Sequence, residues 1–243
     1  MLVGIVSALP AEAQSLIHKK PKARTSYCLS DDARLQLSGI GADRAAAAAR
    51  ELLQQGTVAL LSWGIVGALS TDLASGDVVL PENILAQNGT SYSVDADWHE
   101  QVMQHLLQAM PCRIGSLFCS DCVIESPDRK RDLVRRTAAV AVDMESCAIA
   151  AVAKEAKVPF LAIRVVLDNA RQAIPQSAQA AVDVDGNAMH KQMLRSLLRH
   201  PGDLSAMIKL ARALKKAQGS LKLLSSLLSP SFGYINSRVP ERY

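Results

Sequence analysis

The sequence predicts an α/β protein, with a three-layer α-β-α sandwich built around a mixed, mostly parallel sheet. Short apolar runs rich in valine, isoleucine and leucine alternate with alanine-rich runs of helical character, which is typical of strands crossed over by helices. Glycines follow several apolar runs, at positions 39, 41, 64, 67 and 76, where strand ends need positive φ or close backbone approach. The 243 residues, 49% of them hydrophobic, suffice for one domain with a large core.

The expected elements follow in chain order. The strands fall at residues 2–7, 34–37, 58–63, 77–81, 114–119, 138–142 and 159–166. Helices are expected at residues 42–55, 98–109 and 146–156, and the last one stops at Val158-Pro159 because proline cannot continue a helix.

The C-terminal segment from residue 203 carries a helical stripe. Its apolar residues lie at 207, 210, 211, 214, 217, 221, 224 and 228, and its cations are Lys209, Arg212, Lys215, Lys216 and Lys222. Such a helix lies either on a membrane surface or against the domain or a second subunit. Gly219 and Lys222 favour the packed helix. The expected strands and the candidate catalytic residues all precede residue 203, so we divide the chain into a domain at 1–202 and a basic amphipathic extension at 203–243. We expect the extension to be dispensable for the fold.

Composition excludes several classes of protein. No apolar run reaches 18 residues, so no membrane-spanning helix is expected, and the N-terminus lacks the basic region of a signal peptide. An odd number of cysteines, five, suits a reducing, cytoplasmic compartment. Cys119-x-x-Cys122 has no second pair and no histidine nearby, so we expect no metal and no cofactor. The net charge of +4 is concentrated in the extension, and we expect no binding to nucleic acid.

Two acidic positions stand out at the ends of expected strands. The run at 138–142 leads into Asp143-Met144-Glu145, and the run at 159–166 leads to Asp168. The carboxyl ends of strands are where open α/β sheets bind ligands. Asp143 alternatively caps the helix that follows it. Arg164 lies on the same strand face as Asp168 and either orients a carboxylate or forms a core salt bridge.

With these acidic segments the sequence resembles the purine nucleoside phosphorylase/uridine phosphorylase superfamily, and within it the methylthioadenosine/S-adenosylhomocysteine nucleosidase branch. The resemblance covers most of residues 1–170. It is carried, in order, by the segments at 1–12, 38–41, 63–69 with 76–79, 120–124, and 142–146 with Arg164 and Asp168. Each glycine turn alone is weak, whereas five segments in the right order are a specific match.

The resemblance implies cleavage of the bond between a purine and ribose. It implies that Asp168 is the general acid that protonates purine N7 and that Glu12 activates the attacking water, which is the division of labour of glycoside hydrolysis. It also implies that Glu145 accepts hydrogen bonds from both ribose hydroxyls. Met144 would form an apolar wall to the sugar, and Val123 and Ile124 would flank the base.

The first loop separates hydrolysis from phosphorolysis. Residues 8–12 are apolar and acidic, whereas phosphorylases of this superfamily use an arginine there to hold phosphate. Hydrolysis is therefore favoured, with a phosphorylase as the alternative. One departure from the nucleosidase branch is Ile65, which stands where that branch has a serine in its glycine-rich loop.

The apolar Ile65 and the basic, leucine-rich extension are similar to the hopanoid-associated branch. This resemblance implies adenosylhopane as the substrate and an enzyme at the inner face of the membrane that contacts it peripherally through the C-terminal helix. We expect the extension to be dispensable for the fold but not for the use of this lipid-linked substrate. We also expect a homo-oligomer, a dimer. The alternatives are a nucleosidase for methylthioadenosine or S-adenosylhomocysteine, and an inactive scaffold whose extension binds anionic membrane. The presence of Glu12, Glu145 and Asp168 argues against the scaffold.

Overall fold

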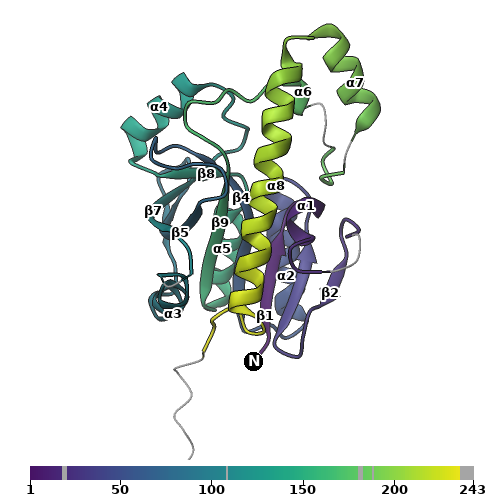
Figure 1. The fold of residues 1–243 in the computed structure, drawn as a ribbon. Helices are drawn as coiled ribbons and strands as arrows, with labels where there is room; N and C mark the ends of the chain where they lie inside the picture. Colours follow the sequence, from purple (N-terminus) through teal and green to yellow (C-terminus); the bar gives the residue numbers. More distant parts are fainter. Residues whose placement is uncertain (18–20, 108, 180–182, 188, 236–243) are drawn as a thin grey trace, which may run out of the picture.

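A computed structural model describes residues 1–17, 21–107, 109–179, 183–187 and 189–235 of the chain. It confirms the predicted α/β fold (Figure 1). Residue 108 of the expected helix at 98–109, and residues 236–243 of the expected extension, lie outside the described residues. The strands are β1 (Val3–Ser7), β2 (Ser26–Cys28), β3 (Ala33–Leu37), β4 (Ala59–Ala68), β5 (Val78–Leu85), β6 (Ser91–Ser93), β7 (Cys112–Cys119), β8 (Ala141–Asp143) and β9 (Phe160–Asp168).

The nine strands form one mixed sheet in the order β2-β3-β1-β4-β8-β7-β5-β6, and β9 pairs with both β4 and β5. Strands β4, β8, β7, β5 and β9 therefore close into a ring. The ring depends on two antiparallel contacts, β4 with β8 and β5 with β9. Irregularities at Val66/Gly67 in β4 and at Pro81/Asn83 in β5 allow these strands to bend.

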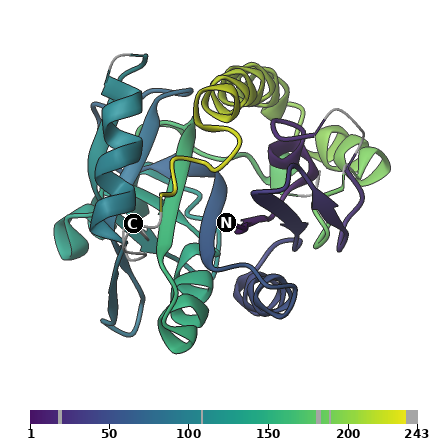
Figure 2. The same cartoon turned by 90° about the horizontal axis from the view of Figure 1, so that it is seen from below.

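Helices cover both faces of the sheet, as Figure 2 shows from below. On one face, α2 (Ala42–Gln54) and α5 (Ser146–Ala156) pack over the side chains of Leu60 and Ala162. On the opposite face, α3 (Ala96–Leu107) and α8 (Asp203–Leu228) share one core with Leu61 and Ile163. Neighbouring strand residues thus enter different cores, which is the alternation that a sheet covered on both sides requires.

The C-terminal segment is a packed helix over its second half. Ala217, Leu221, Leu224 and Leu228 are buried in the same core as the central strands. Beyond α8, the backbone oxygen of Phe232 accepts a hydrogen bond from Trp98 Nε1 at 2.8 Å. The division at residue 203 stays a prediction, and this burial argues against the expectation that the segment is dispensable for the fold.

The first half of α8 has a different environment. Together with α6 (Gln176–Gln179) and α7 (His190–Arg199) it projects beyond the sheet at the top of Figure 1. In the part of the chain that the structure describes, no helix is long and apolar enough to cross a membrane.

Helix α4 (Pro127–Thr137) was not predicted from the sequence. Seven of its eleven residues, PDRKRDLVRRT, are charged, so it lacks the apolar stripe by which helices are recognised. Its start is nevertheless marked by Ser126, whose side chain accepts a hydrogen bond from Arg129 N, and by proline in the first turn, both of which favour a helix N-terminus. The short α1 (Pro10–Ala13) also lay within an expected loop.

Candidate active site

A cavity of about 250 Å³ lies at the carboxyl ends of β8 and β9 and beside the bent half of β4. We call it the site cavity. The register explains why it forms there, because Gly67 of β4 lies beside Asp168 of β9 on one side and Val142 of β8 on the other. Seven of the eight residues predicted from the sequence line it: Glu12, Ile65, Val123, Ile124, Met144, Glu145 and Asp168.

Glu12 is buried and held by four hydrogen bonds. Its Oε2 accepts from Ser7 Oγ at 3.0 Å, Ala8 N at 3.1 Å and Leu9 N at 2.9 Å. Its Oε1 accepts from Ile65 N at 2.9 Å. Burial raises the pKa of Glu12, against the opposing effect of Arg164 and these hydrogen bonds. The result is a fixed carboxylate that is more basic than a glutamate in water.

Glu145 follows β8 at the start of α5. Its Oε1 accepts a hydrogen bond from the backbone nitrogen of Gly41 at 3.0 Å, and Gly41 has a φ of 108°, which a residue with a side chain rarely adopts. Burial, together with the nearby charge of Asp143, raises the pKa of Glu145 to about 7. Glu145 therefore changes charge near neutral pH.

Asp168 is paired with a buried lysine that the sequence analysis did not single out. Lys130 of α4 forms an ion pair with Asp168 Oδ2 and is only 1% exposed. Its ammonium also donates to the backbone oxygens of Asn169 at 2.9 Å and Gln172 at 3.4 Å. Burial raises the pKa of Asp168, and the charge of Lys130 opposes that rise. Lys130 also lines the site cavity.

Arg164, the eighth predicted residue, does not line the site cavity. Its Nη2 donates to Asp143 Oδ2 at 2.6 Å, to Ser62 Oγ at 2.5 Å and to Ser146 Oγ at 2.8 Å. Asp143 Oδ2 in turn accepts from the backbone nitrogen of Ser146 at 3.1 Å. This buried network anchors the β8–α5 turn that carries Met144 and Glu145. Arg164 therefore forms a core salt bridge, and through that salt bridge it orients the turn.

Gly64 of β4 leaves room for two of these charged groups. A Cβ atom at this position would lie 2.5 Å from Glu12 Oε1 and 2.7 Å from Arg164 Nη1. Both distances are far below van der Waals contact, so the absence of a side chain leaves the space beside Gly64 that Glu12 Oε1 and Arg164 Nη1 occupy.

The remaining walls of the site cavity are mostly apolar. They come from segments far apart in the chain, and besides the residues above they include Leu9, Ile40, Val66, Leu167 and Ile174. Cavities of this kind, apolar with a few polar groups, are typical of sites for small organic molecules.

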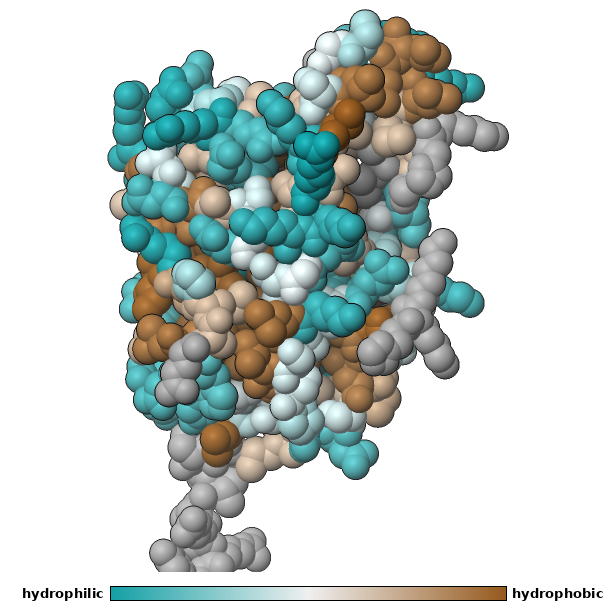
Figure 3. All heavy atoms as spheres, in the orientation of Figure 1, coloured by the Kyte–Doolittle hydropathy of each residue, from teal (hydrophilic) through white to brown (hydrophobic). Residues whose placement is uncertain are grey.

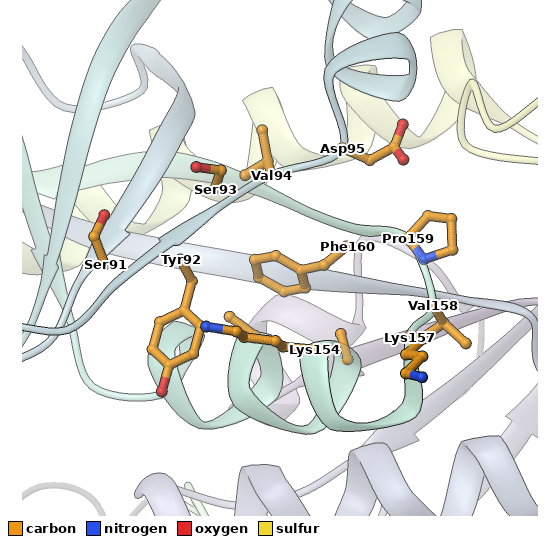
Figure 4. Close-up of a pocket in the computed structure, with 12 residues that line it drawn as sticks. Ser91, Tyr92, Ser93, Val94, Asp95, Lys154, Lys157, Val158, Pro159 and Phe160 are labelled. Carbon is orange, nitrogen blue, oxygen red and sulfur yellow. The ribbon is translucent and has the colours of Figure 1, made fainter.

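A larger cavity of about 460 Å³ lies at the opposite end of β9 (Figure 4). It is lined by residues that include Phe160, Asp95 and Lys157, and Lys154 lies over the Tyr92 ring with its Nζ 5.6 Å from the ring centroid. Phe160 begins the strand that Asp168 ends. None of the three predicted carboxylates lines this cavity, so the site cavity is the candidate active site.

The curled mixed sheet and the carboxylate-lined cavity at its strand ends define an α/β protein with a candidate site at the carboxyl ends of its strands. The model of the phosphorylase superfamily matches residues 3–199, and the chain belongs to that family.

Individual relatives are nucleosidases. A 5′-methylthioadenosine/S-adenosylhomocysteine nucleosidase of Tolumonas auensis is 27% identical over 231 residues, which cover 81% of this chain and 100% of the relative. The same enzyme of Shewanella pealeana is 25% identical, over 72% of this chain and 89% of the relative.

Solved structures share the fold at lower identity. The 5′-methylthioadenosine/S-adenosylhomocysteine nucleosidase of Neisseria meningitidis in complex with methylthio-immucillin-A has a TM-score of 0.70 at 20% identity, over 93% of this chain and 97% of that one. The futalosine hydrolase of Helicobacter pylori has a TM-score of 0.65 at 19% identity, over 82% of this chain and 98% of that one.

Proposed function

We propose that the protein is a nucleosidase that hydrolyses the N-glycosidic bond of a 5′-substituted adenosine and releases adenine. The observation that carries this proposal is that Glu12, Glu145 and Asp168 line one apolar cavity at the strand ends. The nucleosidases among its relatives support the same reaction class.

Asp168 is the proposed general acid. A purine leaves readily only when it is protonated, and Asp168 would donate that proton to N7. Lys130 already bonds Oδ2, so we assign Oδ1 to the base. The carboxylate that remains after proton transfer would be stabilised at once by the ammonium group, without rearrangement of the site.

Glu145 and Glu12 are the proposed sugar and water ligands. As a carboxylate, Glu145 accepts hydrogen bonds from the ribose hydroxyls and favours positive charge on the sugar. Glu12 removes a proton from the attacking water, and its burial makes it a stronger base. Met144 would contact the sugar, and Val123 and Ile124 the base, since all three line the same cavity.

The charges of the cavity favour water over phosphate as the nucleophile. Among the described residues that line it, Lys130 is the one cation, and it is paired with Asp168. Phosphorolysis needs cations, usually arginines, to hold the phosphate. A phosphorylase remains the alternative activity, and it requires cations from outside this cavity.

The apolar walls favour a large apolar 5′ substituent. Leu9, Ile40, Ile65 and Ile174 contribute to them, and none offers a group that binds a polar substituent. We therefore propose adenosylhopane as the substrate, used by a homodimer at the inner face of the membrane that contacts the membrane through its C-terminal helix. Methylthioadenosine and S-adenosylhomocysteine are the alternative substrates.

The test is a panel of 5′-substituted adenosines, incubated with the full chain while free adenine is measured. We expect adenine release without phosphate, fastest for apolar 5′ groups. A rate proportional to added phosphate, with a ribose 1-phosphate product, would overturn the hydrolase assignment. Equal rates for all 5′ groups would overturn the substrate assignment alone.

A further inference from the structure

The projecting helices α7 and α8 expose large apolar side chains. Leu194 and Leu198 of α7 are 59% and 76% exposed, and Leu204 and Ile208 of α8 are 55% and 46% exposed. Each pair is spaced by four residues, so it forms a stripe along one side of its helix. We call these four residues, with the cations beside them, the α7–α8 tip. Figure 3 shows apolar atoms gathered there at the top of the molecule.

The apolar stripes of the tip are bordered by positive charge. Arg195, Arg199, Lys209 and Arg212 are all exposed. Between residues 189 and 216 the sequence contains one acidic residue, Asp203. Its carboxylate accepts hydrogen bonds from the backbone nitrogen and hydroxyl of Ser177 at 3.2 and 2.8 Å. An apolar surface with a cationic border complements a bilayer that contains anionic lipids.

The tip is connected to the rim of the site cavity. In the loop that precedes α7, Val184 O accepts a hydrogen bond from Ile40 N at 2.9 Å. Gly186 of the same loop, with a φ of +78°, lies so close that an added Cβ would be 2.7 Å from Pro10 Cδ and 2.8 Å from Leu9 Cδ2. Leu9 and Ile40 both line the site cavity. A surface bound to the tip therefore lies on the side of the molecule where the cavity is.

We propose that the α7–α8 tip docks the protein on an anionic lipid bilayer, with its leucines among the lipid headgroups and its cations near lipid phosphates. This assigns the contact to α7 and the first half of α8, because the second half of α8 is buried against the sheet. The use of this docking for a lipid-linked substrate rests on the proposed function, whereas the binding to lipid itself does not.

A second copy of the chain is a poorer occupant of this surface. A twofold contact between two tips would bring Arg195, Arg199, Lys209 and Arg212 of both copies together without acidic partners, and like charges in contact are unfavourable. A bilayer with anionic headgroups supplies the missing negative charge.

The experiment is co-sedimentation of the full chain with vesicles of phosphatidylcholine alone or mixed with phosphatidylglycerol, at low and at high salt. We expect binding only to the mixed vesicles, weakened by salt. Two double variants, Leu194→Ser/Leu198→Ser and Arg195→Glu/Arg199→Glu, should each bind roughly tenfold more weakly or worse.

Control variants make the same kinds of change elsewhere. Leu107→Ser removes a leucine that is 69% exposed on α3, and Arg50→Glu/Lys157→Glu reverses two exposed cations outside the tip; both should bind like the parent. Circular dichroism of every variant checks that it is folded. Absence of binding to mixed vesicles, or equal loss in the controls, overturns the proposal.

Sedimentation velocity without vesicles tests whether the tip binds a second copy of the chain instead of lipid. Self-association that the tip variants abolish would show that the surface binds a second copy, and would overturn docking on lipid. Adenine release from a soluble 5′-substituted adenosine is measured in parallel. A protein that docks but releases no adenine would refute the proposed function and leave the docking intact.

Discussion

At the scale of single residues, the ionisation of Glu145 makes the charge of the site depend on pH. Its pKa is raised to about 7, chiefly by burial, and only its ionised form accepts hydrogen bonds from both ribose hydroxyls. We expect kcat/KM for a nucleoside to rise as the pH increases through about 7. Glu145→Gln should lower kcat/KM and remove this titration. A flat profile between pH 6 and 8 in the parent would contradict the assigned role.

Asp168 and Lys130 should be tested as a pair. Asp168→Asn keeps the shape of the side chain but cannot donate a carboxylic proton, so kcat should fall by about 10²–10⁴-fold, the usual contribution of general acid catalysis. It also leaves the buried ammonium of Lys130 without its charge partner, so we expect a lower melting temperature.

Lys130→Met separates these two effects. Without the cation, the opposing influence on the carboxyl is lost and the pKa of Asp168 should rise further. The alkaline limb of the kcat profile should then move to higher pH, a change that a purely structural lysine would not cause. Full pH profiles of the parent and the variant, with thermal melts as control, provide the measurement.

Gly64 should tolerate no side chain. In Gly64→Ala the new Cβ would overlap Glu12 Oε1 and Arg164 Nη1, so we expect loss of both activity and stability. Gly219→Ala is the matched control, because it lies within α8 and a Cβ there meets nothing within 4 Å. It should stabilise by up to about 1 kcal/mol. Equal effects of the two changes would refute the steric argument.

The carboxylates of the site were predictable from the sequence, but their cationic partner was not. Glu145 and Asp168 follow strand-like runs, which places them at the strand ends where open α/β sheets bind ligands. Lys130 is one of five cations in an eleven-residue helix, and nothing in their order shows which one turns inward. Only the packing of α4 against the end of β9 selects it.

At the scale of elements, α8 should be essential for folding. Its residues Ala217, Leu221, Leu224 and Leu228 are buried with the central strands, and Leu→Ala changes at such positions cost about 2–5 kcal/mol. We expect Leu221→Ala to destabilise by that amount and truncation after residue 202 to abolish cooperative folding. Leu223→Ala, at a residue that is 45% exposed, is the control. A truncated chain with a cooperative melt would show instead that 1–202 is a separate domain.

The sequence correctly predicts the periodicity of this helix, but not the length over which the helix contacts the rest of the protein. The four buried residues all belong to the apolar stripe seen in the sequence. The earlier stripe positions, such as Met207 and Leu210, are only half-buried. A spacing of 3.6 residues identifies which face of a helix is apolar, but it does not show how much of that face the rest of the protein covers.

At the scale of the whole molecule, the alternation of strand-like and helical runs in the sequence was enough to predict the class of fold and its two helical layers. The closure of five strands into a ring was not predictable. It depends on β5 meeting β9 and on β4 meeting β8, pairs that are distant in sequence and antiparallel where alternation suggests parallel neighbours. These contacts depend on bends within β4 and β5 that no residue pattern specifies uniquely.

The buried carboxyl of Glu145 should also affect the stability of the whole molecule. Because its pKa is raised from 4.5 to about 7, the folded state binds the proton more tightly than the unfolded state. Its contribution to the free energy of unfolding is therefore complete below about pH 4.5 and is lost as the pH rises to about 7 and above. We expect Glu145→Gln to be the more stable protein above pH 7, with the difference shrinking towards pH 5. Urea unfolding of both proteins across this range is the measurement, and a constant difference would contradict the linkage.

The position of β4 in the ring has a consequence for how such a protein changes its preferences. At Gly67 this strand is bonded to β8 on one side and to β9 on the other, so the floor of the cavity cannot shift without breaking the sheet. Leu9, Ile40 and Ile174 instead come from connecting segments outside the strands, where sequence can vary at little cost to the fold. Libraries that randomise these three positions should yield new 5′ selectivities while the bond-breaking step stays the same, whereas libraries in β4 should yield mostly unfolded chains.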